Sequence, residues 1–304
     1  MKYRHGHHAG NFADVHKHVT LLALLAALKR KDKGFLYLET HAGRGAYSLA
    51  SAAGESATGI GRLDAQSGHL RSGGPGRAPS REPAGAQELR HYLECVARLR
   101  REHADPRLYP GSPLLAASEL RPQDRGVFIE RQPAEARALE RGLIRQGEGR
   151  ARPQQLQVDT GDGFALLRAR LPPAERRGLT FIDPPYEESR QDFDRVRHAA
   201  AEALQRFHTG VVAIWYPIKD QRDTAAWQAA LAGELDCELL AAELSLYPSD
   251  SRVALNGSGM LILNPPYQLA ERMRTWLPEL HACLDLGHGG GASVRRLGRA
   301  QPGP

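Results

Sequence analysis

Two short stretches of the chain end in a pair of prolines followed by a tyrosine. The first reads GLTFIDPPY (Gly178 to Tyr186) and the second reads GSGMLILNPPY (Gly257 to Tyr267). In the first, Asp183 and the carbonyl of Pro184 can both accept hydrogen bonds from one exocyclic amine, and the two prolines restrict the backbone that aims these acceptors. Two acceptors on an aromatic amine favour a pyramidal nitrogen, which frees its lone pair for attack on a methyl sulfonium. The ring of Tyr186 offers a face on which a purine can stack.

The two copies are not expected to do the same work. A double proline after a strand also serves as a simple strand stop. Asn264 lacks the negative charge of Asp183, and it follows a strand that is expected to run antiparallel to the others. Its tip should therefore lie at the opposite edge of the sheet. We predict that Asp183 carries the chemistry, and that Asn264 ends a strand before a helix over Gln268 to Trp276.

Strand-like and helical runs alternate along the chain, which is typical of an α/β fold. The expected strands cover residues 35–39, 127–130, 156–158, 179–182, 211–216, 237–247 and 259–264. The helical runs between the first five strands predict parallel pairing through crossovers, whereas the short polar loop between the last two predicts an antiparallel pair. The pattern predicts a Rossmann-like, class I methyltransferase type of fold: a seven-stranded, mainly parallel sheet with an antiparallel last strand, plus a small helical insertion.

The composition divides the chain into four parts. Residues 1–50 are expected to form an N-terminal cap with a helix over Asp14 to Arg30, the first strand, and the turn THAGRGAYSLA that opens another helix. Residues 51–110 are expected to be the helical insertion, in which 66–87 has almost no large apolar residue and is predicted to be disordered. The helix after it has an apolar stripe of Leu89, Leu93, Val96 and Leu99. Residues 111–286 complete the domain, and 287–304 are predicted to be a disordered tail.

Residues that follow the parallel strands are candidates for ligand binding, because ligands bind beyond the carboxyl ends of such strands. Gly43 and Gly45 after the first strand let the backbone approach a ligand, but the third glycine of a dinucleotide fingerprint is missing, which favours a smaller adenosyl ligand over a nicotinamide cofactor. Glu130 can accept both hydroxyl protons of a ribose, and Asp162 with Gly163 can hold an adenine amino group. Each has a structural alternative: glycines that only shape a turn, a solvated strand end, and a DG turn.

Several polar groups near helix starts could complete a ligand pocket. The stretch YRHGHHAGNFADVHKH contains five histidines, but no carboxylate or cysteine lies at a familiar ligand spacing, so no metal is predicted. A cap over the pocket is the more economical use: Lys17 and His18 could meet a carboxylate, while Tyr3 and Arg4 reach toward nucleic acid. In the turn YPGSP, Ser112 as the N-cap of a helix could share its donors with a ligand carboxylate.

The totals are compatible with a nucleic-acid-binding enzyme inside the cell. The chain has 304 residues and a formal net charge of +6, which favours a polyanionic partner. Cys95, Cys237 and Cys283 are far apart, so neither a zinc site nor a disulfide framework is expected, and a reducing cytoplasm fits. The apolar run Leu21 to Leu28 is too short to cross a bilayer, and the polar residues before it do not resemble a signal peptide.

Five stretches, YRHGHHAGNFADVHKH, FLYLETHAGRGAY, YPGSP, GDGF and IDPPY, occur in this order over nearly the whole chain. With them the chain resembles the bacterial 23S ribosomal RNA adenine-N6 methyltransferases of the RlmJ type. The resemblance implies S-adenosylmethionine as methyl donor, one adenine of 23S rRNA as acceptor, and a monomer that acts on naked or partly assembled RNA. It implies catalysis by Asp183 and contact of Tyr3 with the RNA. The positions that it gives to the cofactor are His18, His41, Ser112, Glu130, Asp162, Gly163 and Asp183, with Lys17 nearby.

Two departures from the family and two other functions stay open. Glu39 stands where the family usually has Asp, and residues 66–87 look like an extra loop. A DNA adenine-N6 methyltransferase is an alternative, since the Asp183 to Tyr186 turn, which we call the first elbow, can act on adenine in either polymer. The lack of a large target-recognition domain nevertheless favours structured RNA. A nucleic-acid-binding protein without catalysis, such as a DNA-utilisation factor, is a second alternative of a different class.

Overall fold

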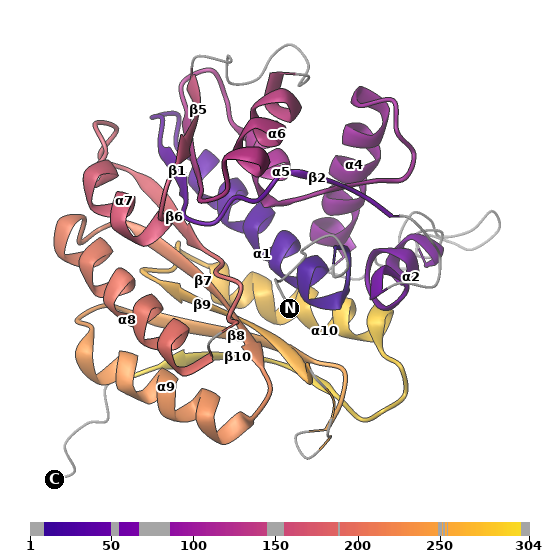
Figure 1. The fold of residues 1–304 in the computed structure, drawn as a ribbon. Helices are drawn as coiled ribbons and strands as arrows, with labels where there is room; N and C mark the ends of the chain where they lie inside the picture. Colours follow the sequence, from indigo (N-terminus) through magenta and orange to yellow (C-terminus); the bar gives the residue numbers. More distant parts are fainter. Residues whose placement is uncertain are drawn as a thin grey trace, which may run out of the picture.

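A central sheet lies between two layers of helices (Figure 1). The computed structural model describes residues 9–49, 55–66, 86–144, 155–187, 189–248, 251, 253 and 255–298. Within these residues the sheet has eight strands, in the order β10 (Gly291–Leu297), β8 (Leu239–Ser245), β9 (Gly257–Leu263), β7 (Val211–Ile218), β6 (Gly178–Ile182), β1 (Leu36–Glu39), β4 (Arg125–Glu130) and β5 (Leu156–Thr160). The strands from β7 to β5 are parallel, whereas β9 is antiparallel to both β7 and β8. The predicted α/β fold and the antiparallel pairing of the last two expected strands are confirmed.

Strand β10 corrects the predicted disordered tail. Residues 291–297 pair antiparallel with β8, from Gly291 opposite Ser245 to Leu297 opposite Leu239. Ala292 and Val294 pack against the core of the sheet. The strand was missed because a glycine-rich run precedes it and two arginines interrupt its short apolar pattern. An edge strand needs only one partner strand and a few inward side chains, so it leaves a weak sequence signal. The end of the tail, 299–304, lies outside the described residues.

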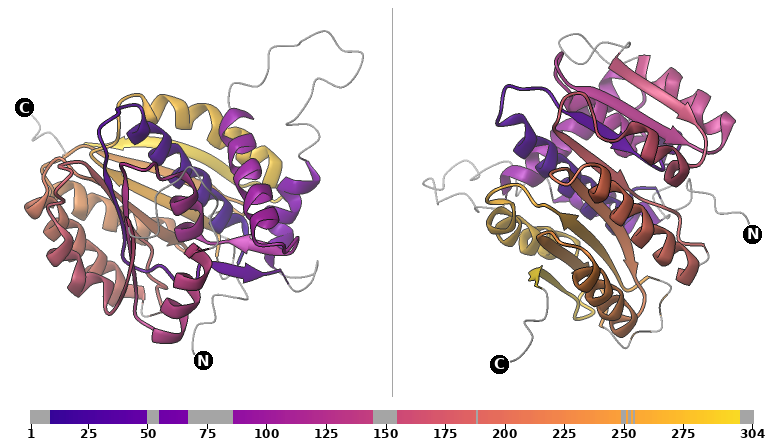
Figure 2. Two further views of the ribbon diagram at one scale, coloured as in Figure 1. Left: turned by 90° about the horizontal axis from the view of Figure 1, so that it is seen from above. Right: turned by 90° about the vertical axis from the view of Figure 1, so that its left-hand side faces the viewer.

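Helices cover both faces of the sheet (Figures 1 and 2). One face carries α1 (Phe12–Lys29), α5 (Ser112–Glu119), α6 (Pro133–Ile144) and α10 (Leu269–Leu284), and the other carries α7 (Gly163–Arg170), α8 (Ser189–Arg206) and α9 (Gln221–Glu234). Neighbouring strand residues point to opposite layers: Tyr37 packs with the first, and Leu36 and Leu38 pack with the second. Because both faces are covered, the central strands are mostly apolar, and Thr180 in β6 and Glu39 at the end of β1 are buried exceptions.

Helix α1 is a buried element that carries polar side chains into the interior. It confirms the helix predicted over Asp14 to Arg30, and its N-cap residue Asn11 accepts a hydrogen bond from the backbone N–H of Asp14. Every residue from Phe12 to Leu25 is buried, including His16, Lys17 and His18. Since buried polar groups need partners, these side chains must be bonded within the protein. Among the described helices, none combines the length and the apolar character that spanning a membrane requires.

The helical insertion joins the main core. It contains η2 (Glu55–Thr58), α2 (Ile60–Ala65) and α4 (Ala86–Glu102), and the predicted stripe on α4 is confirmed, because all four of its residues are buried in the core shared with α1 and α10. Residues 86 and 87 belong to α4, so the predicted disordered stretch 66–87 ends two residues too late. Its residues 67–85 lie outside the described residues.

The helix predicted from THAGRGAYSLA is wrong for residues 46–48. They form strand β2 (Ala46–Ser48), which pairs antiparallel with β3 (Leu108–Pro110) in a small second sheet. Gly45 adopts a φ of +77°, and its carbonyl accepts a hydrogen bond of 2.7 Å from the N–H of Gly111. The turn is therefore held against the YPGSP segment, and the chain leaves it extended instead of helical.

Candidate active site

The strand register brings the predicted catalytic and cofactor residues to one edge of the sheet. Glu39, the last residue of β1, is aligned with Phe181 in β6 on one side and with Phe128 in β4 on the other. Asp183 and Glu130 each come two residues after these partners, so they stand on either side of the turn that follows β1. Neighbouring strands are about 4.8 Å apart, which puts the two backbones about 10 Å from each other.

The turn after β1 is shaped by glycines and fastened to Glu130. Gly43 has a φ of +63°, a conformation that side chains disfavour. Its backbone N–H donates a hydrogen bond of 2.8 Å to Oε2 of Glu130, while the N–H of Gln132 donates one of 2.7 Å to Oε1. Glu130 is therefore more than a solvated strand end: its carboxylate is aimed at the mouth of the turn. Gly163 lies close behind, where a Cβ would approach the carbonyl oxygen of Thr40 to 1.8 Å.

Asp183 is held by a buried lysine from α1. Lys17 Nζ donates to Oδ2 of Asp183 at 2.6 Å and lies 2.9 Å from Oδ1 of Asp14. The side chains of Lys17 and Asp183 are only 5% and 8% exposed. Burial acts to lower the pKa of Lys17, but the carboxylates of Asp14 and Asp183 outweigh it and raise that pKa above its usual range. The lysine is therefore a fixed cation that sets the orientation of the Asp183 carboxylate.

Asp162 lies at the start of α7, and the ring centroid of His41 lies 4.8 Å from that of Phe164 in the same helix. Asp162 is the N-cap of α7: its Oδ1 accepts hydrogen bonds from Phe164 and Ala165, and its Oδ2 accepts one of 3.1 Å from Arg195. Burial acts to raise the pKa of Asp162, but these hydrogen bonds and the charge of Arg195 outweigh it and hold that pKa below its usual value. Burial lowers the pKa of His41 to about 4, so this imidazole is neutral at physiological pH. Asp162 and Gly163 form the start of α7 instead of the DG turn that was the structural alternative, and the binding of an adenine amino group by Asp162 stays a prediction.

Below the edge, Glu39 is completely buried. Ser112 Oγ donates a hydrogen bond of 2.5 Å to its Oε1, and the hydroxyl of Tyr37 donates one of 2.9 Å to its Oε2. Burial raises the pKa of Glu39 to about 8, and the nearby Asp183 acts in the same direction. The N-cap of α5 is Gly111, not Ser112 as predicted. The longer acidic side chain at position 39 thus reaches two hydroxyl groups in the layer beneath the turn.

The histidines of α1 are also engaged within the protein. His18 is 1% exposed, and its Nδ1 lies 2.9 Å from the hydroxyl of Tyr109. Nδ1 of His16 lies 3.0 Å from Oγ of Ser258, and burial lowers the pKa of His16 to about 3. These two histidines hold α1 against its neighbours. The predicted RNA-contacting residues, Tyr3 and Arg4, lie outside the described residues.

The ring of Tyr186 is covered, which corrects the expected stacking face. It is 4% exposed, its hydroxyl donates a hydrogen bond of 2.7 Å to the carbonyl of Trp215, and its ring centroid lies 4.8 Å from that of Phe193. Pro184 is buried and Pro185 is exposed. Trp215 was not predicted to matter, although Lys17 Nζ lies 5.5 Å from its ring centroid. Its position in the apolar run VVAIWY gives no sign of this contact.

The second elbow, Asn264 to Tyr267, lies at the opposite edge of the sheet, as predicted. Asn264 Nδ2 donates to the carbonyls of His208 and Gly210, at 2.7 and 2.9 Å, in the loop that leads into β7. Tyr267 is 83% exposed. Helix α10 begins directly after this elbow, so the segment is a strand stop that also braces the start of β7.

The strand order, the glycine turn after β1 and the acidic elbow after β6 together define a class I methyltransferase. A family model described as "Ribosomal RNA large subunit methyltransferase D, RlmJ" matches residues 32–296. The chain belongs to this RlmJ family.

Two related proteins and a solved structure are similar to the chain over almost its full length. "Ribosomal RNA large subunit methyltransferase J" of Escherichia coli (strain K12) is 38% identical over 298 residues, which cover 97% of this chain and 98% of that protein. The protein of the same name from Haemophilus influenzae is 36% identical and covers 93% and 94%. The crystal structure of protein LPL1258 from Legionella pneumophila has a TM-score of 0.78 at 31% identity and covers 97% of this chain and 99% of that one. The similarity therefore includes the insertion as well as the catalytic core.

Proposed function

We propose that this protein transfers a methyl group from S-adenosylmethionine to the N6 amine of one adenine in 23S rRNA. The observation that carries the proposal is the position of Asp183, a carboxylate held by Lys17 at the tip of β6, across the glycine turn from Glu130. The names of the related proteins support an RNA of the large ribosomal subunit as substrate. We further propose that the protein acts as a monomer in the cytoplasm.

The residues at this edge fit an adenosyl cofactor. When bound, S-adenosylmethionine supplies a methyl group activated by a sulfonium. Glu130 is held by two backbone N–H groups and keeps further lone pairs for ribose hydroxyls. We assign Glu130, Asp162, Gly163 and His41 to the cofactor, because they line the glycine turn. Lys17, His18 and Ser112 lie in the buried layer beneath, where their contact with the cofactor stays a prediction.

The chain prepares the adenine amine by supplying two fixed acceptors. Lys17 occupies Oδ2 of Asp183, so Oδ1 is the oxygen that we assign to the substrate amine. The carbonyl of Pro184 is the second acceptor, and its peptide is restrained by the following proline. Two hydrogen bonds of this kind pull the amine nitrogen out of conjugation and direct its lone pair at the methyl group. Since neither acceptor has to move, the geometry exists before the RNA binds.

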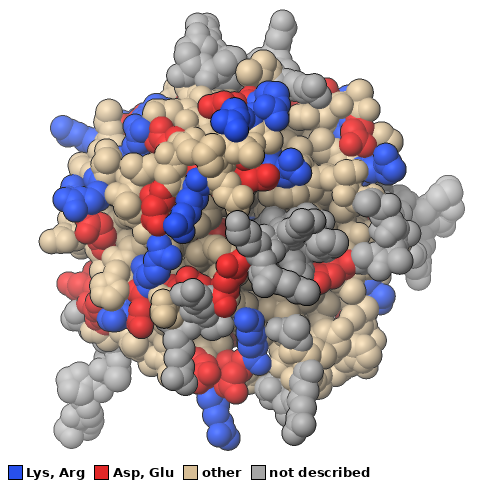
Figure 3. Space-filling view, in the orientation of Figure 1, with Lys and Arg blue, Asp and Glu red and all other residues tan. Residues whose placement is uncertain are grey.

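The residues that we propose for RNA binding are not chosen from a basic patch on the surface. On the face shown in Figure 3, Lys and Arg side chains are interspersed with Asp and Glu. The net charge of +6 favours RNA in general but does not mark a path on this face. Tyr3 and Arg4 remain our candidates for RNA contact, and the role of Tyr186 becomes that of a buried support for the elbow.

The decisive experiment compares RNA and DNA as methyl acceptors. The protein is incubated with labelled S-adenosylmethionine and either unmodified 23S rRNA or duplex DNA, and nucleosides are then separated. We expect label in N6-methyladenosine from the RNA. Label only in DNA would favour the DNA methyltransferase, and RNA binding without any transfer would favour a non-catalytic binder.

A further inference from the structure

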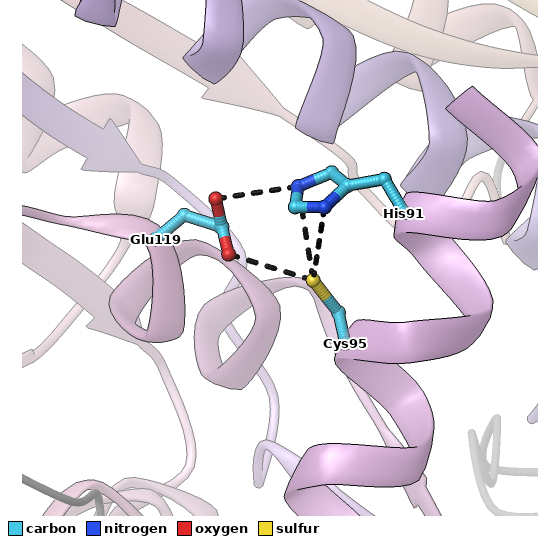
Figure 4. Close-up of side chains that lie close together, drawn as sticks. All are labelled: His91, Cys95 and Glu119. Carbon is cyan, nitrogen blue, oxygen red and sulfur yellow. Dashed lines mark hydrogen bonds and ion pairs between the residues drawn. The ribbon is translucent and has the colours of Figure 1, made fainter. Parts of the chain in front are cut away.

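A second cluster of reactive side chains lies in the helical insertion, apart from the residues assigned to methyl transfer. His91 and Cys95 are four residues apart on α4 and face Glu119 at the end of α5 (Figure 4). In the part of the chain that the structure describes, they form a group in which an imidazole, a thiol and a carboxylate each offer one ligand atom, all within 4.8 Å. This cluster could not be predicted from the sequence, because Glu119 lies on another helix.

The separations between these groups approach the edges of a metal tetrahedron. Zinc lies about 2.3 Å from sulfur and about 2.0 to 2.1 Å from nitrogen and oxygen, so neighbouring ligands in a tetrahedral site are about 3.3 to 3.6 Å apart. In the structure, Cys95 Sγ lies 3.8 Å from His91 Nε2 and 3.4 Å from Oε1 of Glu119. His91 Nε2 lies 3.3 Å from Oε2 of Glu119. These two contacts use different oxygens of Glu119, so its carboxylate must turn to offer one oxygen to the ion, and the three ligand atoms, which lie within 4.8 Å of one another, must then move closer together.

We propose that His91, Cys95 and Glu119 form a binding site for a divalent ion of the zinc type that fastens α4 to α5. A thiolate, an imidazole and a carboxylate are all ligands that zinc accepts, and the thiolate disfavours magnesium and calcium. Three protein ligands leave a fourth position for water. The His91 side chain is 37% exposed, which gives the ion a route from solvent to the buried thiol.

Two cationic side chains near Glu119 affect how tightly an ion can bind. Lys29 Nζ lies 2.5 Å from Oε2 and Arg98 Nη2 lies 3.0 Å from Oε1. The incoming ion displaces the proton of the Cys95 thiol and the proton of His91 Nε2, which faces Oε2 of Glu119, so the two protons released balance its two positive charges. The Lys29 side chain is 24% exposed and can swing into solvent, which frees Oε2 of Glu119 and removes the repulsion between the ammonium group and the ion. Lys29 is therefore a competitor of the ion, and Arg98 a hydrogen-bond donor that orients the carboxylate.

The test is a titration of the full-length protein, stripped of metal by a chelator, with Co²⁺ as a spectroscopic probe. We expect a sulfur-to-cobalt charge-transfer band that saturates at one ion per chain and is abolished by Zn²⁺, and we expect Zn²⁺ to raise the melting temperature. Cys95→Ser should lose the band because it removes the sulfur, and both Cys95→Ser and His91→Gln should weaken Zn²⁺ binding by about tenfold or more. Cys283→Ser, which alters a buried cysteine outside the cluster, should behave as wild type.

Lys29→Gln separates a metal site from an ordinary ion-pair cluster. If Lys29 competes with the ion, this variant binds Zn²⁺ more tightly than wild type. The proposal is overturned if wild type shows neither the band nor the thermal shift, if Cys283→Ser removes the band, or if Lys29→Gln weakens binding. Should Cys95→Ser not fold, His91→Gln decides, since that side chain is partly exposed.

Discussion

The two elbows of this protein share the letters Pro-Pro-Tyr but differ in every physical respect that matters for chemistry. Asp183 lies at the carboxyl ends of the parallel strands and is bonded to a buried lysine, whereas Asn264 lies at the other edge and donates to two backbone carbonyls. The Tyr186 ring is buried, and Tyr267 is exposed. Strand direction decides the difference, because β6 runs parallel to its neighbours and β9 runs antiparallel.

The backbones of the two elbows also differ. In the first elbow the left-handed residue is Tyr186, with a φ of 50°, and in the second it is Asn264, also with a φ of 50°. Asn adopts this conformation more readily than most residues, whereas a bulky Tyr needs tertiary support to hold it. The buried hydroxyl bond to Trp215 provides that support in the first elbow. Similar sequences therefore make two different turns, and only one presents an acidic side chain beside the glycine turn.

The largest contrast is expected from exchanging the acidic and amide side chains. Asp183→Asn should reduce methyl transfer by about a thousandfold, because the amide presents an N–H where the substrate amine needs an acceptor. Asn264→Asp should leave the rate per folded molecule unchanged, but it should lower the free energy of unfolding by about 1 to 3 kcal/mol, because a carboxylate would face two carbonyls. Initial rates and denaturant unfolding of both variants measure this. Loss of catalysis in Asn264→Asp would contradict the separation of roles, and RNA binding by Asp183→Asn serves as the control for substrate access.

The buried cation is the next difference to test. Lys17→Met should lower the free energy of unfolding by about 3 to 5 kcal/mol, because it removes the ammonium group that Asp14 and Asp183 share in a buried site. Lys219→Met is the matched control: this lysine is exposed near the end of β7, and its loss should change stability by less than about 0.5 kcal/mol. Equal effects in urea denaturation would show that the ion pair at the first elbow contributes no special stability.

Much of this contrast could be predicted from the sequence. The alternation of strands and helices fixed the direction of each strand, and direction alone separated Asp183 from Asn264. The pairing of Lys17 with Asp183 could not be predicted, since 166 residues separate them and only the packing of α1 on the sheet brings them together. Burial of Tyr186 was missed for a related reason, because the side chains that cover it, Phe193 and Trp215, come from other elements.

Short strands were the other failure of sequence interpretation. Residues 46–48 form β2 only because β3 lies alongside them, and 291–297 form β10 only because β8 has a free edge. Neither segment has a long periodic pattern, so local preference is weak and tertiary pairing decides. The longer parallel strands, buried on both sides, left continuous apolar runs that could be recognised directly.

A difference in pH response should distinguish the two edges. Burial raises the pKa of Glu39 from 4.5 to about 8, so the folded protein binds a proton that the unfolded chain releases. The stability contributed by this group is complete below pH 4.5 and is lost as the pH rises toward 8. We expect the free energy of unfolding to decline across this window, and Glu39→Gln to flatten the decline. Asn264→Gln, which alters the uncharged elbow, should leave the slope unchanged, and a slope that persists in Glu39→Gln would assign it to another group.

The smallest effect concerns the two tyrosines. Tyr186→Phe removes the hydrogen bond to the Trp215 carbonyl but keeps the packed ring, so the free energy of unfolding should fall by about 1 kcal/mol. Tyr267→Phe should change nothing measurable, because its side chain is in solvent. The kcat of methyl transfer should fall in Tyr186→Phe, because a looser first elbow misplaces Asp183 without altering cofactor binding. If instead the Michaelis constant for RNA rises while the free energy of unfolding stays at the wild-type value, the Tyr186 hydroxyl contacts the RNA directly. In that case the hydroxyl must leave the Trp215 carbonyl during the reaction, so the first elbow must open.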